Sequence, residues 1–397
     1  MSLENIMNTY SRTDLIFESG HGSWLVTKDG KKILDFNSGI AVNALGHCHP
    51  HLVDSLQSQI KKLWHCSNLY RIESQELLAS RLVASSFADS VFFCNSGAES
   101  VEAAIKVARK YSQTRNPNKK KYKIIVTTNA FHGRTLATIS AGGQEKHLEG
   151  FYPAVGGFKR VEFGNISQII ENIDEETIGI LIEPIQGEGG INQAEDTYLK
   201  DIREICNQRG LVLIFDEVQC GMGRSGKLFA HEKYDVVPDI MCLAKGLGGG
   251  FPIGACLATK KVSQYMTPGT HGSTFGGNPL AMTAANALLD IILSKGFLNK
   301  VNESSVKLID GLQKIIIKYQ SVFLKLKGQG LMLGIKCRVP NSLLVDRLVE
   351  KGLLTVVAGD NVVRLLPPLN ISNEEIDIAI SIIEHVAHSI EIENVRK

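Results

Sequence analysis

The chain has 397 residues, of which 44% are hydrophobic and 21% are charged, and its formal net charge is +2. A chain of this length can bury a large core and normally forms more than one domain. The small net charge gives no indication of a nucleic-acid partner, and no apolar run approaches the roughly 20 residues that a membrane helix needs. The eight cysteines are scattered and include no C-x-x-C pair. We therefore expect a cytoplasmic protein with reduced thiols.

Short apolar runs predict buried strands in the middle of the chain. Each run is continuous rather than alternating, as in strands that are covered on both faces. The predicted strands are 90–94, 123–127, 178–182, 211–215, 240–243 and 254–258. Helical patterns lie between several of them, at 99–111 and 198–208. Strands that alternate with helices predict an α/β fold with a mostly parallel, doubly wound sheet, in which ligands bind at the carboxyl ends of the strands.

The two ends of the chain have a different pattern. After about residue 285, predicted helices at 280–293, 301–319 and 374–390 surround short strands at 332–336 and 362–365. The first ~50 residues also differ in composition from the central region. We expect a large domain of residues 56–285 and a smaller α+β domain that combines residues 1–55 with residues 286–397.

Two of the predicted strands end in residues that can carry chemistry. The run LVLIF (211–215) leads directly into Asp216, and the strand 240–243 is followed by Ala244 and Lys245. A carboxylate at the end of a buried strand is either solvated or directed at a ligand. A lysine amine can form a Schiff base with an aldehyde cofactor, and a carboxylate can keep a pyridine nitrogen protonated so that the ring accepts electrons. This pairing indicates pyridoxal phosphate (PLP).

Two loops after strands complete the candidate site. The turn NSGAE (95–99) joins a predicted strand to a helix, and the free backbone N–H groups and dipole at the start of that helix favour a phosphate. The alternative is an ordinary helix cap by Asn95 or Ser96. Both can hold at once, because capping and phosphate binding use neighbouring groups. In the segment FHGRT (131–135), Phe131 can stack on a planar cofactor, and Arg134 can bind a carboxylate through two hydrogen bonds. A core Phe131 and a solvated Arg134 are the alternatives.

The chain resembles the class III PLP-dependent aminotransferases of fold type I. The resemblance covers nearly the whole chain, from GIAVNALGH (39–47) to VRLLPPL (363–369). The motifs between these two are CNSGAES (94–100), AFHGRTL (130–136), IEPIQGEGG (182–190), LIFDEVQCGMGRSG (213–226), LAKGLGGGFPIGA (243–255) and HGSTFGGNPL (271–280). Several long motifs in the right order are a specific signal.

The resemblance implies a set of cofactor-binding residues. Lys245 would bind PLP covalently and carry the proton between substrate and cofactor, and Asp216 would pair with the pyridinium nitrogen. The expected cofactor-binding residues are Ser96, Gly97, Ala98, Phe131, Asp216, Val218, Gln219, Lys245 and Thr274. Thr274 would reach the phosphate in the neighbouring subunit, so the resemblance implies a homodimer with active sites at the subunit interface.

The resemblance also implies how the substrates bind. The motifs are most similar to those of the subgroup that moves the terminal amino group of N2-acetyl-L-ornithine to 2-oxoglutarate, a step of arginine synthesis. Arg134 would bind the α-carboxylate of that substrate, Ser273 would lie beside it, and Arg364 would bind the α-carboxylate of glutamate. Glu188 would neutralise Arg364 for the substrate without a carboxylate there, because an unpaired buried guanidinium is costly.

Other substrates of the same class remain open. Succinylornithine, succinyl-diaminopimelate, ornithine and 4-aminobutyrate are the alternatives. Cys220 stands where many relatives have threonine, and the stretch KGLGGG (245–250) fits the acetylornithine subgroup best. Racemases and mutases of the fold would share Lys245 and Asp216 but need no second carboxylate-binding pair, so the combination of Glu188 with Arg364 favours transamination.

Two motifs suggest unrelated functions. The stretch GMGRSG (221–226) formally matches a dinucleotide-binding or P-loop pattern, but no clear helix follows it and Leu228 replaces the Ser or Thr of a P-loop. The histidines His47, His49 and His51 are too closely spaced to enclose one ion, so we expect no metal site. A non-catalytic descendant of the fold is disfavoured by the joint retention of the candidate catalytic and substrate-binding residues.

Overall fold

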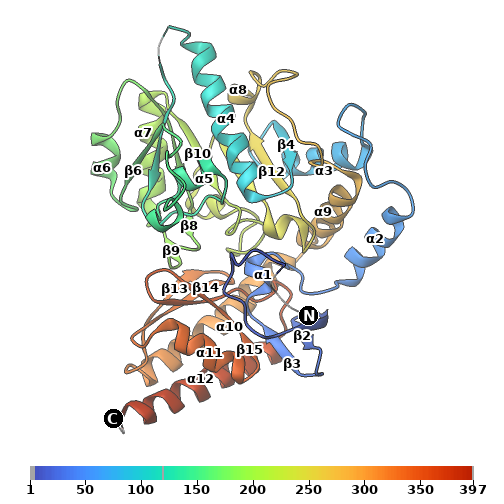
Figure 1. The fold of residues 1–397 in the computed structure, drawn as a ribbon, viewed down its shortest axis with the longest axis vertical. Coiled ribbons are helices and arrows are strands. Elements are labelled where there is room, and N and C mark those ends of the chain that lie inside the picture. The colour runs from blue at the N-terminus through green and yellow to red at the C-terminus, as the bar shows by residue number, and fades with distance from the viewer. Residues whose placement is uncertain (1–4, 119, 396–397) are drawn as a thin grey trace.

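The computed structural model describes residues 5–118 and 120–395. The fold has two parts, with the central region of the chain above and both chain ends below (Figure 1). The upper part is built on a seven-stranded sheet with the order β4-β12-β11-β10-β7-β5-β6. Its strands are β4 (Ser90–Cys94), β5 (Lys123–Thr127), β6 (Phe158–Val161), β7 (Thr177–Ile182), β10 (Val212–Asp216), β11 (Ile240–Leu243) and β12 (Gly254–Ala258).

The sheet is parallel except at one strand. β11, β10, β7, β5 and β6 pair in parallel, whereas β12 runs antiparallel to both of its neighbours, β11 and β4. β4 therefore points the same way as the five parallel strands. The carboxyl ends of six strands meet at one edge of the sheet, which is where an open α/β sheet binds its ligands.

Helices cover both faces of this sheet, which explains the continuous apolar runs. Ile124 and Val126 of β5 belong to the core beneath α4 (Gly97–Arg115), while the intervening Ile125 packs on the opposite face with side chains of α7 (Asp196–Arg209). Successive side chains of a strand point to opposite faces. A strand covered on both sides must therefore be apolar at every position.

The lower part combines the two chain ends. One sheet has the order β1-β2-β3-β15, and β15 (Leu353–Leu354) pairs in parallel with β3 (Lys32–Asp35). A second, antiparallel sheet has the order β13-β14-β17-β16. The other strands are β1 (Phe17–His21), β2 (Trp24–Thr27), β13 (Phe323–Gln329), β14 (Met332–Cys337), β16 (Val356–Ala358) and β17 (Val362–Leu365). The helices here are α1 (Ser38–Ala41), α10 (Phe297–Lys318), α11 (Asn341–Glu350) and α12 (Asn373–Val395).

The remaining elements join or flank these two parts. α9 packs against α2 and α3 on the right-hand side of the view in Figure 1. The α-helices are α2 (Pro50–Ile60), α3 (Glu73–Ala84), α5 (Leu136–Ala141), α6 (Ile166–Glu171), α8 (Lys260–Ser263) and α9 (Pro279–Ile292). The short elements are η1 (Glu145–His147), η2 (Ala230–Tyr234), η3 (Lys245–Gly248), β8 (Ile185–Gln186) and β9 (Asn192–Gln193).

The predicted fold class is confirmed: the molecule is α/β, with a mostly parallel sheet. All six central strands form within a residue of their predicted bounds. The edge strand β6 was missed, because FKRV has two cations and only two apolar residues. The predicted domain junctions after residues 55 and 285 fall inside α2 and α9. The division into a large domain of residues 56–285 and a smaller domain from both chain ends stays a prediction.

A membrane-spanning segment is not apparent in the part of the chain that the structure describes. No single helix there is long and apolar enough to cross a bilayer. α9 and α10 meet the length and composition test only jointly, and they are bent by 73° where they meet.

Candidate active site

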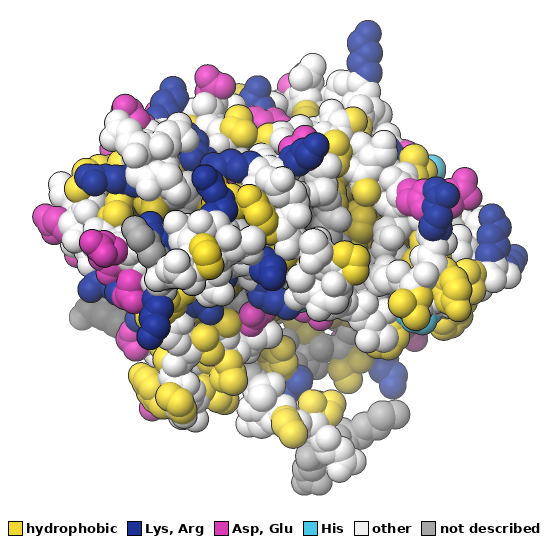
Figure 2. All heavy atoms as spheres, turned by 90° about the horizontal axis from the view of Figure 1, so that it is seen from above, with side chains coloured by type: hydrophobic (Ala, Val, Ile, Leu, Met, Phe, Trp, Pro, Cys, Tyr) yellow, Lys and Arg dark blue, Asp and Glu magenta, His cyan; other side chains and the backbone are white. Residues whose placement is uncertain are grey.

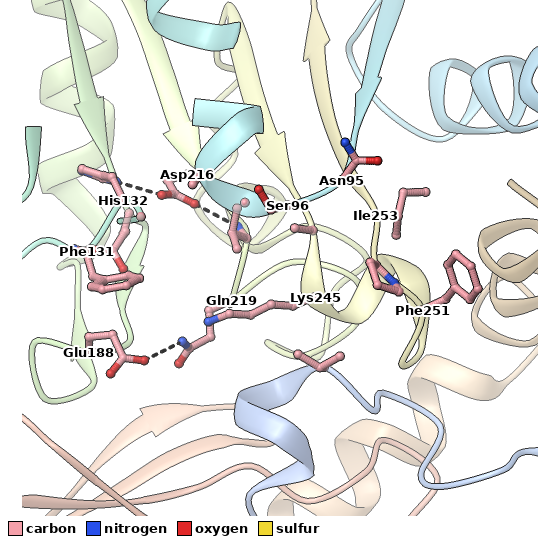
Figure 3. Close-up of a pocket in the computed structure, with 18 of the residues that line it drawn as sticks. Asn95, Ser96, Phe131, His132, Glu188, Asp216, Gln219, Lys245, Phe251 and Ile253 are labelled. Carbon is pink, nitrogen blue, oxygen red and sulfur yellow. Dashed lines mark hydrogen bonds and ion pairs between the residues drawn. The ribbon is translucent and has the colours of Figure 1, made fainter. Parts of the chain in front are cut away.

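A cavity of about 320 Å³ opens at the carboxyl edge of the large sheet. Most of its wall is formed by residues at or beyond the ends of five strands, β4, β5, β7, β10 and β11; Val42 and residues 250–253 complete it. The lining includes Asn95, Ser96, Gly97, Ala98, Phe131, His132, Glu183, Glu188, Asp216, Val218, Gln219 and Lys245. Motifs as far apart in the sequence as those of Asn95 and Lys245 therefore meet in one cavity, as the parallel-strand argument predicts (Figure 3).

Asp216 ends β10 and is hydrogen-bonded on both carboxylate oxygens. Its Oδ2 lies 2.8 Å from Nδ1 of His132, and its Oδ1 accepts the backbone N–H of Val218 at 3.0 Å. Burial alone would lower the pKa of His132, but the hydrogen bond to Asp216 and its charge outweigh burial and raise that pKa above its ordinary value. His132 Nε2 is buried without a partner. The pair thus presents to the cavity a carboxylate that is oriented by a buried imidazole.

Lys245 is the first residue of η3, directly beyond the end of β11. Its backbone has φ +44°, a left-handed conformation that a side-chain-bearing residue rarely adopts and that is found at functional sites. Burial lowers the pKa of its amine to about 8, and the Glu188 carboxylate offsets only part of this effect. Figure 3 shows the side chain extending toward Gln219 and Glu188. A larger share of Lys245 is therefore a neutral, nucleophilic amine at neutral pH than of an ordinary lysine.

The turn before α4 forms a concave site for an anion. Ser96 is the N-cap, and its Oγ accepts the backbone N–H of Glu99 at 3.2 Å. A Cβ at Gly97 would lie 2.7 Å from Cγ1 of Val218, so only glycine fits there. The first backbone N–H groups of this 19-residue helix are available to a ligand because they have no acceptor within the helix. Of the two cap residues left open by the sequence, the structure uses Ser96.

Phe131 and Arg134 lie at different depths. Phe131 lines the cavity, whereas Arg134 is exposed and lies outside the lining, with its guanidinium carbon 5.6 Å from the centre of the Phe131 ring. This contact is a cation–π interaction. The structure thus places Arg134 at the rim of the site rather than within the cavity.

Glu188 and Arg364 form an ion pair across the two parts of the molecule. Arg364, on β17, is fully buried and donates to both oxygens of Glu188, at 2.6 and 3.1 Å. It also donates to Oε1 of Gln219 at 2.8 Å. Burial raises the pKa of Glu188, but the Arg364 charge outweighs that effect and leaves the pKa below its ordinary value. Glu188 and Gln219 therefore separate the guanidinium from the cavity.

Ser273 and Thr274 lie beside the cavity but not in its lining. Asn95, which does line it, donates to Oγ of Ser273 at 3.2 Å. Thr274 is exposed. Within a single chain the Ser273 hydroxyl contacts the cavity wall only through Asn95, and the expected roles of Ser273 and Thr274 stay predictions.

Sequence reasoning assigned no role to two titratable residues of the cavity, His132 and Glu183. His132 follows β5, which is not adjacent to β10, so no local pattern could pair it with Asp216. Glu183 did have a signal: it is a carboxylate directly after the wholly apolar strand β7, the same pattern that identified Asp216. Its pKa is raised to about 7, mainly by burial.

The structure also shows the surroundings of the closely spaced histidines, of Cys220 and of the glycine-rich stretch 221–226. His47 and His51 each bond an aspartate at 2.8 Å, Asp35 and Asp290 respectively. Among the described residues no group of His, Cys, Asp and Glu is arranged to hold a metal. Cys220 is buried, and burial raises its pKa well above the ordinary value, which suppresses thiolate reactivity. The glycine-rich stretch 221–226 leads into the short 3-10 turn η2 rather than a helix, unlike a nucleotide-binding loop.

The model of the family "Aminotransferase class-III" matches residues 6–387. The chain belongs to the class-III aminotransferases. Among curated relatives, acetylornithine aminotransferase of Brucella melitensis is 52% identical, covering 98% of this chain and 96% of its own length. The enzyme of that name from Mesorhizobium japonicum is 53% identical, covering 96% and 95%.

Solved structures agree with this family assignment. An ornithine aminotransferase from Toxoplasma gondii superposes with a TM-score of 0.94 at 29% identity, covering 98% of this chain and 94% of its own. N-acetylornithine aminotransferase from Stenotrophomonas maltophilia superposes with a TM-score of 0.86 at 36% identity, covering 98% and 99%. The predicted family and its fold are confirmed.

The cofactor of this aminotransferase is pyridoxal 5′-phosphate, and the cavity fits it. PLP needs an amine for its aldehyde, an anion site for its phosphate, a carboxylate for its ring nitrogen and a flat apolar contact for its ring. Lys245, the Ser96–Gly97 turn, Asp216 and Phe131 supply these four features around one cavity. Its volume also falls at the lower end of the range of small-molecule sites.

Proposed function

We propose that the protein transfers the terminal amino group of N2-acetyl-L-ornithine to 2-oxoglutarate, giving N-acetyl-L-glutamate 5-semialdehyde and L-glutamate. The observation that carries this proposal is the ion pair of Arg364 and Glu188 beside Lys245. Curated relatives named acetylornithine aminotransferase, about half identical over nearly the whole chain, support the substrate. The reaction would serve arginine synthesis.

Lys245 and Asp216 have the central chemical roles in this proposal. When bound, PLP supplies an electron sink for the carbanion that forms when the substrate loses a proton. Lys245 would hold the cofactor through its amine, and the lowered pKa of that amine suits it to accept and return the substrate's proton. Asp216, held by His132, would keep the ring nitrogen protonated. Ser96, Gly97 and Ala98 would hold the phosphate, Val218 and Phe131 would cover the ring, and Gln219 would contact the ring hydroxyl.

One cavity must accept two different substrates. Glutamate presents an α-carboxylate next to its reacting amine, whereas acetylornithine reacts at an amine with no carboxylate nearby. With Glu188 in place, Arg364 is neutralised and the site accepts acetylornithine. When glutamate binds, its carboxylate replaces Glu188 on the guanidinium, forming two parallel hydrogen bonds. Arg134 at the rim binds the distal carboxylate of acetylornithine, and Ser273 lies beside that substrate.

The active enzyme in this proposal is a homodimer. The segment between α2 and α3 exposes large apolar side chains, among them Trp64 at 60% and Leu69 at 87%. Asn68 of this segment donates to the carbonyls of Ser273 and Gly276 and so holds the loop that carries Thr274. Hydrophobic side chains also gather at the right-hand edge of the face in Figure 2, on the side of α2 and α3 in Figure 1. Such a patch is typical of a subunit interface, and it supports a role for Thr274 at the partner's phosphate.

The chain organisation and the compartment are also proposals. The parallel pairing of β3 with β15 supports one small domain that is made from both chain ends. All eight cysteines are free thiols. Free thiols in this number agree with a reducing compartment such as the cytoplasm.

The first experiment is a visible spectrum of the purified protein with PLP, followed by single additions of amines. Acetylornithine should discharge the absorbance band of the bound cofactor faster than succinylornithine, succinyl-diaminopimelate, ornithine or 4-aminobutyrate, and 2-oxoglutarate should restore it. Lys245→Ala should abolish turnover, because no other amine takes its place. If the band responds best to another amine, that amine is the substrate. Full activity of Lys245→Ala would refute the mechanism.

A further inference from the structure

Glu183 is a buried carboxylate that the proposed mechanism does not use. It follows β7, lines the cavity and is 5% exposed. No lysine or arginine among residues 5–118 and 120–395 forms a salt bridge with it within 4.0 Å. A buried carboxylate without such a partner is costly, so the fold must use this group for a specific purpose.

Both oxygens of Glu183 accept backbone N–H groups, and these groups belong to different loops. Oε2 accepts the N–H of Phe131 at 3.0 Å, and Oε1 accepts the N–H of Gly187 at 3.3 Å. Phe131 covers the proposed ring position, and Gly187 immediately precedes Glu188. One carboxylate therefore connects the loop that covers the cofactor to the loop that neutralises Arg364.

The second of these loops has little freedom to move independently. A Cβ at Gly187 would lie 2.3 Å from Oε1 of Gln219, so the backbone runs tightly against that side chain. Gln219 in turn accepts from Arg364 and donates to Glu188, at 2.8 and 3.4 Å. A shift at Gly187 would reach both partners of the ion pair.

A proton-carrying role for Glu183 is the competing interpretation. His132 and Asp216 are close enough for their charges to affect Glu183, and its pKa is raised to about 7. Both of its oxygens are, however, occupied by backbone donors that favour the ionised form. This geometry is that of a positioning residue rather than of an acid that exchanges protons with substrate.

We propose that Glu183 is a positioning residue that fixes the distance between the Phe131 loop and the Glu188 loop. Cofactor retention and the choice between the two substrates then depend on one carboxylate. The inference about substrate choice rests on the proposed exchange of Glu188 for glutamate at Arg364. The inference about cofactor retention does not.

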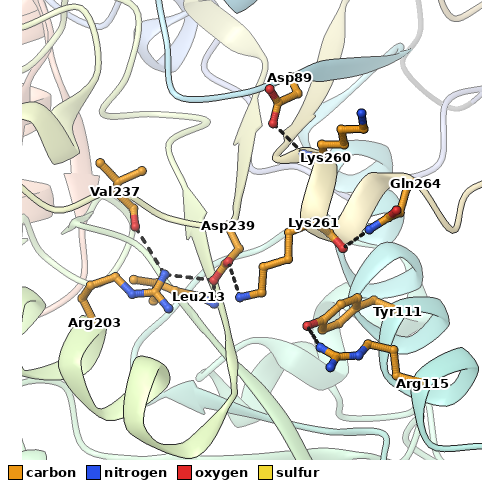
Figure 4. Close-up of polar contacts among 10 residues, drawn as sticks. All are labelled: Asp89, Tyr111, Arg115, Arg203, Leu213, Val237, Asp239, Lys260, Lys261 and Gln264. Carbon is orange, nitrogen blue, oxygen red and sulfur yellow. Dashed lines mark hydrogen bonds and ion pairs between the residues drawn. The ribbon is translucent and has the colours of Figure 1, made fainter.

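The test compares Glu183→Gln with Asp239→Asn. Asp239 is a matched control because it is also buried and also accepts a backbone N–H, that of Leu213 at 2.9 Å (Figure 4). It directly precedes β11, whereas Glu183 directly follows the parallel strand β7, so the two carboxylates lie at opposite ends of the sheet. In Glu183→Gln one acceptor oxygen becomes an amide that faces an N–H group. Two quantities are measured: the dissociation constant of PLP, by equilibrium dialysis, and kcat/KM of each half-reaction with glutamate and with acetylornithine.

We expect Glu183→Gln to raise the PLP dissociation constant about ten-fold, the cost of a lost hydrogen bond to a charged group. Misplacing Glu188 should also lower kcat/KM for acetylornithine more than kcat/KM for glutamate, because Arg364 is then poorly neutralised. Asp239→Asn should change neither quantity. Unchanged PLP affinity, or affinity that falls equally in both variants, overturns the inference.

A third variant separates this inference from the proposed function. Arg364→Ala should impair glutamate selectively, the opposite selectivity to Glu183→Gln. If Arg364→Ala impairs both substrates equally, the exchange at Arg364 is wrong, and PLP affinity alone then decides whether Glu183 positions the Phe131 loop. If Arg364→Ala is selective but Glu183→Gln is not, the proposed function stands and the coupling through Glu183 is wrong.

Discussion

Asp216 and Asp239 are two buried aspartates at opposite ends of the adjacent parallel strands β10 and β11, and their surroundings differ sharply. Asp239 lies 2.9 Å from Arg203 and 3.0 Å from Lys261, and it accepts the N–H of Leu213. Burial alone would raise its pKa, but the Leu213 hydrogen bond and the Arg203 charge outweigh burial and lower it. Its charge is thus compensated by neighbours that belong to the fold.

Asp216 forms no salt bridge with a lysine or arginine among the described residues, unlike Asp239. Its partners are His132 and the backbone of Val218, and it borders the cavity. The fold orients this carboxylate and leaves part of its interaction capacity for a ligand. The comparison teaches that burial of a carboxylate does not mark a functional site by itself; the partner set distinguishes the two ends of the sheet.

The largest expected effect separates the two aspartates by activity. Asp216→Asn should lower kcat by about 10²–10³-fold, because the amide cannot provide the charge for a protonated ring nitrogen. Asp239→Asn should leave kcat unchanged, since it lies at the other end of the strands. Steady-state kinetics with acetylornithine and 2-oxoglutarate measure kcat of both variants. An equal loss of kcat in both would show that Asp216 is no more important for catalysis than Asp239.

The next effect concerns the ion pair that shields the cavity. Arg364→Ala should weaken kcat/KM for glutamate by about 3 kcal/mol, the value of a hydrogen-bonded charged contact, and should affect acetylornithine less. Single-turnover measurements of the two half-reactions test this expectation. Equal losses for both substrates would show that Glu188 and Arg364 do not exchange partners.

A third prediction uses Lys245, a buried cation in the same cavity. In the cofactor-stripped protein, burial holds its pKa at about 8 instead of 10.5. Between these values the unfolded chain binds a proton that the native state lacks, so the free energy of unfolding rises with pH there. Below pH 8 both states are protonated and the full penalty applies.

Cofactor-stripped Lys245→Met should therefore be more stable than the parent protein at pH 7. The gain is at most about 3.5 kcal/mol, because the pKa falls from 10.5 to about 8 and each pH unit corresponds to about 1.4 kcal/mol. The difference should shrink as the pH rises from 8 toward 10.5. Urea unfolding at several pH values measures it, and a difference that grows with pH would mean that the amine is not destabilised by burial.

The smallest effect completes the comparison at Asp239. Asp239→Asn should lower the free energy of unfolding by about 2 kcal/mol, since Arg203 loses its buried partner while the half-exposed Lys261 contributes little. Asp216→Asn should cost less stability in the cofactor-free protein. Thermal or urea unfolding of both variants shows which one loses more stability. A larger loss in Asp216→Asn would contradict our account of how the two carboxylates are compensated.

Sequence patterns predicted the strand ends that carry Asp216 and Lys245, because parallel strands bring their carboxyl ends to one edge. The same patterns could not predict that β12 is antiparallel, since an apolar run such as GACLA has no direction. They also could not pair His132 with Asp216, because β7 lies between β5 and β10. Glu183 was predictable in principle, as a charge at the end of an apolar strand.

Arg134 shows a different limit of the sequence. Its motif predicted a carboxylate-binding residue, but the motif does not specify how far the side chain extends into the site. The chain turns at Gly133, where φ is +135° and a Cβ would lie 2.6 Å from that of Ala98. This close approach places Arg134 at the rim, over the Phe131 ring.

The pairing of β3 with β15 has a consequence for synthesis on the ribosome. β3 ends at Asp35, and its partner begins at Leu353, more than 300 residues later. At about 5–20 residues per second, the earlier strand waits roughly 15 to 60 s for its neighbour to be translated. The large domain can therefore fold around its own sheet while β3 still lacks its neighbour β15, and β17 with Arg364 joins the site only as the last part of the chain emerges.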